Sequence, residues 1–434
     1  MIRNRNAIVA LLTGLNFLNY LDRYIVAAVL PRIQAELGLS NFEGGLLATV
    51  FLLGYFVTSP IFGMLGDRLP RKYLIAVGVF TWSCATFATG MSTSLWSLLV
   101  ARVFVGIGEA SYATLAPTII DDIAPPDKKG KLLAIFFLAT PVGSALGYLF
   151  GGEIQKAWGW REAFYLGGGP GMLLALLCLG IDEPVRAHLA SARDRLGGII
   201  VRLARITLYR RAVLGYCAHT AVLGAFSFWA PTYLSQRFFA DLAKDPTSPD
   251  AASQVLQSAN FWFGAVTVVA GAIGTLVGGR MADRALRGLP PVPADADHEH
   301  PANLRAANAQ LKVCALGVAF GFPLVAAAVL APSAWMFFVL AGLAEIGLFL
   351  STAPINAILL RTAPPYLRAS AMAVAIFAIH LFGDLWSPSA VGLLLDNLPV
   401  AMAMMALPAG IALAAALWWP RARETETPAP SAGG

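Results

Sequence analysis

GMLGDRLPRK, at residues 63–72, recurs in shortened form as GRMADR at residues 279–284. Both copies contain the pattern G-x-x-x-D-R, both follow a long apolar run, and they start 216 residues apart, half the length of the chain. Two halves that carry the same loop element after their second helix are typical of transporters built from two related bundles. The pair therefore predicts an internal repeat rather than two unrelated turns.

The composition of the 434 residues points to a membrane protein, since 57% are hydrophobic and only 13% are charged. Soluble domains carry about 25% charged residues. A water-soluble globule, a disordered chain and a nucleic-acid-binding protein are therefore excluded. The four cysteines lie in apolar runs with spacings that suit neither zinc nor a disulfide framework, so we expect no metal and no cofactor.

Twelve apolar segments approach the length of roughly 20 residues that a bilayer core requires. Because loose backbone cannot satisfy its hydrogen bonds in hydrocarbon, we predict that all twelve are helices. The predicted spans are 7–30, 43–65, 73–91, 95–119, 132–152, 163–181, 212–235, 255–279, 311–331, 334–358, 369–394 and 399–419.

The positions of the lysines and arginines orient these spans. If the N-terminus is inside, 24 of the 31 basic residues fall in inner segments and five in outer loops, with Arg23 and Arg102 inside spans. Such a bias places both termini in the cytoplasm. We therefore predict an integral, multi-pass protein of the plasma membrane. High alanine content and short loops favour a bacterial inner membrane.

The predicted organisation is an all-α fold of two pseudo-symmetric six-helix bundles. Residues 1–181 form the first bundle, 182–211 a cytoplasmic linker, 212–420 the second bundle and 421–434 a disordered tail. The linker places Arg202 and Arg205 among apolar residues, which fits an amphipathic helix on the anionic inner leaflet. A plain tether is the alternative.

Charged residues within the first bundle are candidates for a functional site, because charge inside a membrane is costly. These are Asp22 and Arg23 in the first span and Arg102 and Glu109 in the fourth. At about 1.5 Å per residue, Asp22 and Arg102 lie at a similar depth, about 10–12 Å from the outer face, and can pair if their helices adjoin. Arg23 is then left to attract an anionic substrate group or to pair with Glu109. Small residues at 106, 108 and 110 allow a neighbouring helix to approach closely.

Glu109 and Asp22 are the candidate proton carriers, because a nearby arginine that moves away would change how firmly a carboxylate holds its proton. The alternative is that Asp22 and Arg102 form a fixed salt bridge that only pins two helices. The second bundle contains three further candidates, Glu345, His380 and Asp384. Their side chains either line a cavity or make their hydrogen bonds between helices. His380 and Asp384 are four residues apart, so we expect them to interact.

Residues 63–72 resemble the loop signature of the major facilitator superfamily, with Pro70 where that family usually has glycine. The resemblance implies that Asp67, Arg68 and Arg71 engage neighbouring helix ends and stabilise the outward-open state. Asp283 and Arg284 are the weaker counterpart in the second half.

Longer stretches resemble the Spinster family of lysolipid and sphingolipid transporters. They are residues 106–121 (GIGEASYATLAPTIID), 136–148 (FFLATPVGSALGY) and 380–388 (HLFGDLWSP) with Gly392 and Asp396, together with Trp229-Ala-Pro231. The second stretch is also similar to the antiporter motif of facilitators, but Tyr148 replaces the usual proline.

The resemblance implies proton-coupled transport of an amphiphilic lysolipid or sphingolipid, such as a lysophospholipid or sphingosine-1-phosphate, by a protein that is not an enzyme. No H-E-x-x-H, G-x-S-x-G or P-loop pattern is present. The partners we expect are this lipid, protons and membrane lipids, with the protein a monomer that binds no nucleic acid. The alternative is proton symport of a small soluble organic anion. The predicted substrate-binding residues are Arg23, Arg102, Tyr112, Glu345, His380, Asp384, Trp229 and Phe226.

Overall fold

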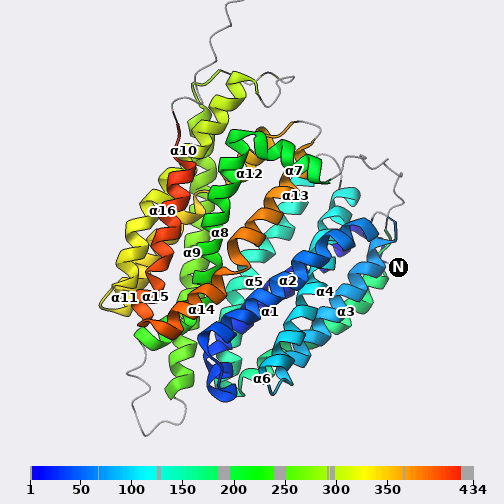
Figure 1. Ribbon diagram of the computed structural model, residues 1–434. Helices are drawn as coiled ribbons and strands as arrows, with labels where there is room; N and C mark the ends of the chain where they lie inside the picture. The colour runs from blue at the N-terminus through cyan, green and yellow to red at the C-terminus, as the bar shows by residue number, and fades with distance from the viewer. Residues whose placement is uncertain are drawn as a thin grey trace, which may run out of the picture. The chain divides into compact units, whose positions relative to one another are not determined.

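The computed structural model is helical throughout the part of the chain that it describes (Figure 1). It describes residues 2–66, 68–124, 129–183, 196–238, 251–290, 293, 299–364 and 367–421. Within these ranges there is no β-strand, and one isolated bridge joins Ile2 to Ile181. The all-α prediction is therefore confirmed.

The helices are α1 (Arg5–Leu37), α2 (Asn41–Gly66), α3 (Arg71–Gly90), α4 (Leu95–Ile123), α5 (Lys129–Ala157), α6 (Trp160–Leu179), α7 (Leu196–Arg205), α8 (Thr207–Arg237), α9 (Ala251–Leu286), α10 (Pro301–Val329), α11 (Ala334–Phe349), α12 (Thr352–Arg361), α13 (Arg368–Ile379), the π-helix η3 (His380–Asp384), α14 (Ser387–Asn397), α15 (Val400–Met404) and α16 (Ala406–Trp418).

Eleven helical segments of the described chain are long and apolar enough to cross a membrane. The last three combine neighbouring helices, at Ala334–Arg361, Ser370–Asn397 and Val400–Trp418. Eleven of the twelve predicted spans therefore have a counterpart. The exception is α1, which is 33 residues long but contains Asn16, Asn19, Asp22 and Arg23, so that its mean hydropathy is low. The count of twelve, and with it the cytoplasmic position of both termini, stays a prediction.

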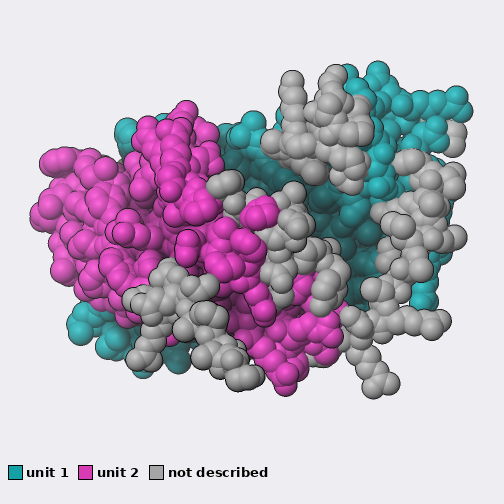
Figure 2. Space-filling model, turned by 90° about the horizontal axis from the view of Figure 1, so that it is seen from above, with its two compact units in different colours: residues 1–189, 225–268, 385–404 teal, residues 190–224, 269–384, 405–434 magenta. Residues whose placement is uncertain are grey.

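The chain divides into two compact units (Figure 2). Unit 1 comprises residues 1–189, 225–268 and 385–404, and unit 2 comprises 190–224, 269–384 and 405–434. The boundaries cut through α8 and α9 and fall between η3 and α14. Unit 1 therefore contains α1–α6, parts of α8 and α9, and all of α14 and α15. The predicted domain boundaries at 181, 211 and 420 group the chain differently and stay a prediction.

In unit 1, α1 packs against α5, α2 against α4, and α3 against both α4 and α6. Glycines bring these helices together. A Cβ atom at Gly106 would collide with the backbone oxygen of Phe51 in α2, and one at Gly108 would lie 2.5 Å from the backbone oxygen of Gly78 in α3. The predicted close approach at 106 and 108 is thus confirmed, and it fixes the face of α4 that carries the buried charges.

The polar helix α1 is held by α5 through a second set of glycines. A Cβ at Gly143 would lie 2.5 Å from the backbone oxygen of Phe17, and one at Gly147 would lie 2.6 Å from that of Leu21. This G-x-x-x-G spacing, which continues to Gly151, lets two helix backbones pack directly. It places the side chains of Asp22 and Arg23 among α2, α3 and α4.

In unit 2, α10 packs against α11, α12 and α16. The helix that begins as α13 changes at His380 into the π-helix η3 and continues after Asp384 as α14 in unit 1. Single π-turns inside α-helices are rare and are frequent at functional sites.

Candidate functional site

Four charged residues form the polar centre of unit 1. The exposed fractions of Asp22, Arg102 and Glu109 are 1%, 2% and 0%, and the Arg23 side chain is 22% exposed. Asp22 and Arg23 come from α1, and Arg102 and Glu109 lie two turns apart on α4. When both acids are ionised, the four side chains balance in charge, which lowers the cost of burying them.

Arg23 and Glu109 form the ion pair of this cluster. Arg23 Nη2 donates a 2.7 Å hydrogen bond to Glu109 Oε2. The second oxygen, Glu109 Oε1, is buried without a hydrogen-bond partner in the described part of the chain. Of the two alternatives that the sequence leaves for Arg23, this conformation shows the pair with Glu109.

Asp22 is bound by α3 and not by Arg102. Trp82 Nε1 donates to Asp22 Oδ2 at 3.2 Å, and Thr86 Oγ1 donates to the same oxygen at 3.5 Å. A Cβ at Gly167 in α6 would lie 2.7 Å from Oδ1, so the carboxylate faces α3 and α6. Within the described residues no ion pair joins Asp22 to Arg102, and the expected pairing of these two residues is absent.

Arg102 lies instead against the aromatic ring of Phe51. The guanidinium carbon of Arg102 is 4.7 Å from the centre of this ring, and that of Arg23 is 4.9 Å from it. Arg23 also lies 5.0 Å from the Tyr20 ring and 5.6 Å from the Tyr55 ring. Cation–π contacts of this kind stabilise a guanidinium group where water is scarce. The site thus combines two cations with aromatic rings.

No pattern in the sequence pointed to Phe51, Trp82, Thr86 or Tyr55 as parts of the site. They are ordinary apolar or polar residues of the second and third spans, with no motif around them. Tyr20 is two residues before Asp22, a residue that the sequence marks as a candidate.

Three predicted substrate contacts are engaged in packing. Tyr112 is fully buried, its hydroxyl donates to the backbone oxygen of Leu12, and its ring lies 5.5 Å from that of Trp82. Trp229 is fully buried and donates from Nε1 to the backbone oxygen of Pro388 at 2.8 Å. Phe226 is partly exposed and packs edge-on against Phe263. A role for these three in substrate binding stays a prediction.

Unit 2 contains the charged candidates of the second half. His380 Nδ1 lies 3.0 Å from Asp384 Oδ1 across one turn of η3, so the expected contact between them is confirmed. Glu345 in α11 is 3% exposed. A further buried histidine, His219 in α8, was not predicted from the sequence. Its Nε2 lies 3.4 Å from Ser351 Oγ.

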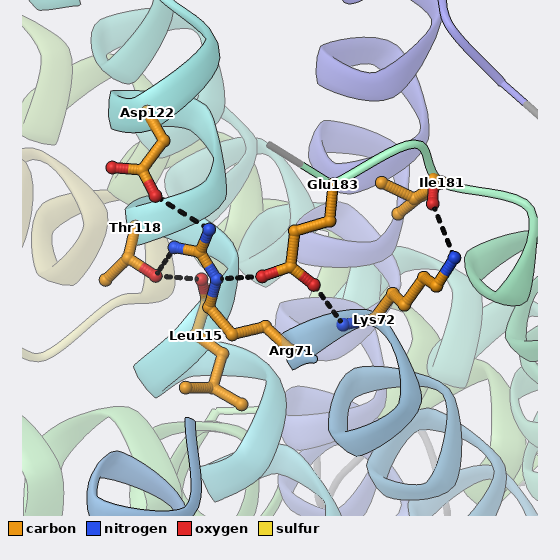
Figure 3. A network of polar contacts seen from close by, with 7 residues as sticks. All are labelled: Arg71, Lys72, Leu115, Thr118, Asp122, Ile181 and Glu183. Atoms are coloured by element: carbon orange, nitrogen blue, oxygen red, sulfur yellow. Dashed lines mark hydrogen bonds and ion pairs between the residues drawn. The ribbon is translucent and has the colours of Figure 1, made fainter. Parts of the chain in front are cut away.

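The loop motif centres on Arg71, whose side chain is fully buried (Figure 3). Its guanidinium group forms ion pairs with Asp122 at 2.7 Å and Glu183 at 2.5 Å, and it donates to Thr118 Oγ1 at 2.8 Å. Lys72 adds a backbone hydrogen bond to Glu183, at 3.2 Å. Arg71 thus ties α3 to the end of α4 and to the chain that leaves α6.

The other motif residues are placed differently. Asp67 lies outside the described residues. Arg68, Asp283 and Arg284 are exposed. Their predicted roles in conformational gating, like that of Arg71, stay predictions.

At the opposite end of α2, a carboxylate from the second half caps the helix. Asp396 of α14 accepts 2.8 Å hydrogen bonds from the backbone N–H groups of both Asn41 and Phe42. Farther along the same pair of helices, Thr49 Oγ1 donates to the backbone oxygen of Leu385 at 2.7 Å. A carboxylate at a helix N-terminus is favoured by the unpaired N–H groups and by the helix dipole.

Two further hydrogen bonds join the first-half helices to α8 and α9 within unit 1. Asn260 Nδ2 donates to the backbone oxygen of Ala28 at 2.9 Å, and the Tyr148 hydroxyl donates to that of Ser227 at 2.5 Å. Tyr148 is the residue that departs from the antiporter motif, and its hydroxyl makes a bond that a proline could not. In unit 1, therefore, helices of both halves are joined at the end away from Arg71.

Comparisons with known proteins agree with this arrangement. Residues 12–294 match the sequence profile of the Major Facilitator Superfamily. Protein spinster homolog 3 of Danio rerio is 34% identical over 411 residues, covering 90% of this chain and 76% of that protein. The probable sphingolipid transporter spinster homolog 2 of Arabidopsis thaliana is 33% identical over 386 residues, covering 84% and 72%.

A solved structure shares the fold. The crystal structure of a bacterial homologue of the human lysosomal transporter Spinster, in an inward-facing and occupied conformation, matches with a TM-score of 0.78. The match covers 99% of this chain and 100% of that chain, at 22% identity. The chain therefore belongs to the Spinster family of the major facilitator superfamily, and it is an integral multi-pass membrane protein and a secondary transporter, not an enzyme.

Proposed function

We propose that this protein moves an amphiphilic lysolipid or sphingolipid across the membrane by alternating access, coupled to protons. The observation that carries the proposal is the ion pair between Arg23 and the fully buried Glu109, with Asp22 directly before Arg23 in α1. The name of the Arabidopsis relative, a probable sphingolipid transporter, supports the substrate class.

Protons enter the scheme through Glu109. While it is ionised, Glu109 neutralises Arg23 and holds it by a charge-assisted hydrogen bond. When it is protonated, the ion pair is lost and Arg23 is available to an anionic group. A proton and an anionic head group would then be bound in a linked manner. Asp22, held by the neutral donors Trp82 and Thr86, is the second proposed carrier.

The substrate class follows from the neighbours of the two arginines. A guanidinium group can bind a phosphate through two parallel hydrogen bonds. Phe51, Tyr20 and Tyr55 surround Arg23 with apolar surface that suits the portion of a lipid next to its head group. Glu345, His380 and Asp384, which belong to unit 2, stay proposed substrate contacts.

Gating is assigned to two sets of contacts. The network around Arg71, together with Asp67 and Arg68, would lock one end of the bundle. The cap that Asp396 places on α2 would lock the other. Both sets are formed in this conformation. The cap joins helices of the two sequence halves and would have to break when its end opens, and Asp283 and Arg284 would act with the first set in the second half.

Proton symport of a small soluble organic anion is the alternative, because a carboxylate would use the same arginines. Lipid transport and soluble-anion transport can be distinguished in proteoliposomes by measuring proton-driven uptake of a lysophospholipid and of a soluble dicarboxylate. Lysophospholipid uptake that the dicarboxylate does not inhibit is the expected result. Uptake of the dicarboxylate without competition by lysophospholipid would establish the alternative.

Glu109→Gln tests the proton role in the same assay. We expect the folded variant to lose the response of uptake to a proton gradient, since glutamine keeps the shape of the side chain but cannot ionise. Glu162→Gln, on the first turn of α6 and outside the charge cluster, is the control and should keep the response. An unchanged pH dependence in Glu109→Gln would rule out the proposed carrier.

A further inference from the structure

The short helix α7 is bound closely to the membrane end of α8. It ends at Arg205, and α8, which is a candidate membrane span, begins at Thr207. Only Ile206 separates them, and α7 runs across the end of α8 instead of extending it (Figure 1). With a connection of one residue, α7 cannot leave the neighbourhood of the bilayer surface.

Two contacts fix the angle between α7 and α8. Arg210, in the first turn of α8, donates from Nη1 to the backbone oxygen of Ala204 at 3.1 Å. This bond satisfies one of the carbonyl groups that a helix C-terminus leaves unpaired. Leu203 is fully buried, and α7 packs against α13 in the same unit. The helix is therefore held in one orientation.

With this orientation, α7 has one packed face and an outward side. At 3.6 residues per turn, Ile199 and Leu203 share the face that packs on the protein. Ile200 and Val201 lie about 100° apart on the outward side, where they are 37% and 53% exposed. The exposed Arg205 is four residues after Val201 and shares its row, and the exposed Arg202 lies beside Arg205.

We propose that the outward side of α7 binds the anionic leaflet of the membrane in which the protein sits. Ile200 and Val201 would enter the boundary between head groups and acyl chains, and Arg202 and Arg205 would contact lipid phosphates. Apolar and basic sectors side by side are what an interfacial helix requires, and α7 contains no acidic residue that would repel an anionic surface. This role is independent of the transported substrate.

The bilayer is a better partner for the outward side of α7 than a soluble protein is. The two apolar side chains alone offer a small area, well below what a specific protein interface buries. The membrane surface, by contrast, is already adjacent and needs no separate association step. Each basic residue near an anionic surface contributes roughly 1 kcal/mol to binding, which corresponds to about a fivefold change in the binding ratio.

The experiment uses the full-length protein in nanodiscs of phosphatidylcholine, with or without phosphatidylglycerol. Three of the four free cysteines are buried, so Cys84→Ala removes the accessible one. A fluorophore on Val201→Cys is then quenched either by brominated acyl chains or by aqueous iodide. We expect brominated lipid to quench it, and more strongly when phosphatidylglycerol is present.

The double variant Arg202→Gln/Arg205→Gln should lower the ratio of bound to unbound α7 by roughly 30-fold and abolish the effect of phosphatidylglycerol. The control Arg287→Gln/Arg305→Gln removes the same charge from two exposed positions, one directly after α9 and one in α10, and should retain that effect. Quenching by iodide alone in both lipids would overturn the proposal and identify α7 as a solvated tether. Quenching by brominated lipid that is the same with and without phosphatidylglycerol, or the same with and without the two α7 arginines, would overturn it as well. The proposal requires the contact between these arginines and lipid phosphates.

Discussion

At the scale of single residues, Phe51 connects the two cations of the site. It lies within 5 Å of both Arg23 and Arg102, although these belong to different helices. Two guanidinium groups that share one ring repel each other, and the ring together with Glu109 offsets this repulsion. The cluster is therefore sensitive to the loss of a single negative charge, as the proposed role of Glu109 requires.

The contribution of Glu36 to the stability of the protein is predicted to depend on pH. Its carboxylate accepts hydrogen bonds from Trp160 Nε1 at 2.7 Å and from Arg161 Nη1 at 2.5 Å. The hydrogen bond from Trp160, and then Arg161, hold the pKa of Glu36 below its ordinary value of 4.5. Because the pKa is lowered by folding, the ionised form stabilises the protein at neutral pH, and this contribution disappears as the pH falls through the lowered pKa.

Glu36→Gln should therefore lower the melting temperature in detergent at pH 7, and the difference from wild type should close in acid. The side chain is 48% exposed, so the effect is at most about 1 kcal/mol. Glu153→Gln, whose carboxylate accepts from the neutral Gln257, is the control. A difference between wild type and Glu36→Gln that does not change with pH would contradict the assignment.

At the scale of helices, the contact between α2 and α4 depends on Gly106. Gly106→Ala would drive a methyl group into the backbone of Phe51, which cannot move aside as a flexible side chain could. Overpacking of this kind costs about 1–3 kcal/mol or more. Gly63→Ala on the same pair of helices is the control, because its Cβ would lie 3.9 Å from Thr114. Thermal unfolding followed by size-exclusion chromatography should show loss of stability in the first variant only.

The cap on α2 gives a second prediction at this scale. Asp396→Ala removes both hydrogen bonds to the α2 N-terminus, a change that costs about 0.5–2 kcal/mol. The population should shift by about 2- to 30-fold toward a state in which α2 and α14 are apart. Spin labels at the exposed Phe42 and Leu398 should then report longer distances.

Asn397→Ala is the matched control for the cap. It changes the next residue, whose side chain donates only within its own helix, to the backbone oxygen of Leu393. Equal distance distributions in Asp396→Ala and Asn397→Ala would show that the cap does not hold these ends together.

At the scale of the whole molecule, the sequence predicted eleven helical spans and the positions of Asp22, Arg102 and Glu109 inside the bundle, because hydropathy and charge are local properties. It also predicted the contact between His380 and Asp384, which depends only on helical spacing. It could not predict that Trp82 binds Asp22 or that Glu183 binds Arg71. Those partners are 60 and 112 residues away, and their identity depends on how the helices pack.

The number of spans gives a prediction for the whole chain. If α1 crosses the membrane, Ala35, in the last turn of α1, and Leu69, after α2, lie on opposite sides, and both termini lie on one side. Ala35→Cys in a Cys84→Ala background should react with a membrane-impermeant maleimide on intact cells, whereas Leu69→Cys should react only after the cells are opened. Labelling of both positions from the same side would contradict a membrane-spanning α1.

The polarity of α1 has a consequence for biosynthesis. Each charged residue at the centre of a helix raises the free energy of insertion by about 2.5–3.5 kcal/mol on the scale measured at the translocon. Asp22 and Arg23 together would make α1 a poor substrate for the insertion machinery when it leaves the ribosome alone. We therefore expect α1 to settle into the bilayer only after α4 and the glycine face of α5 have been synthesised, so that α1 is integrated after helices that are made later.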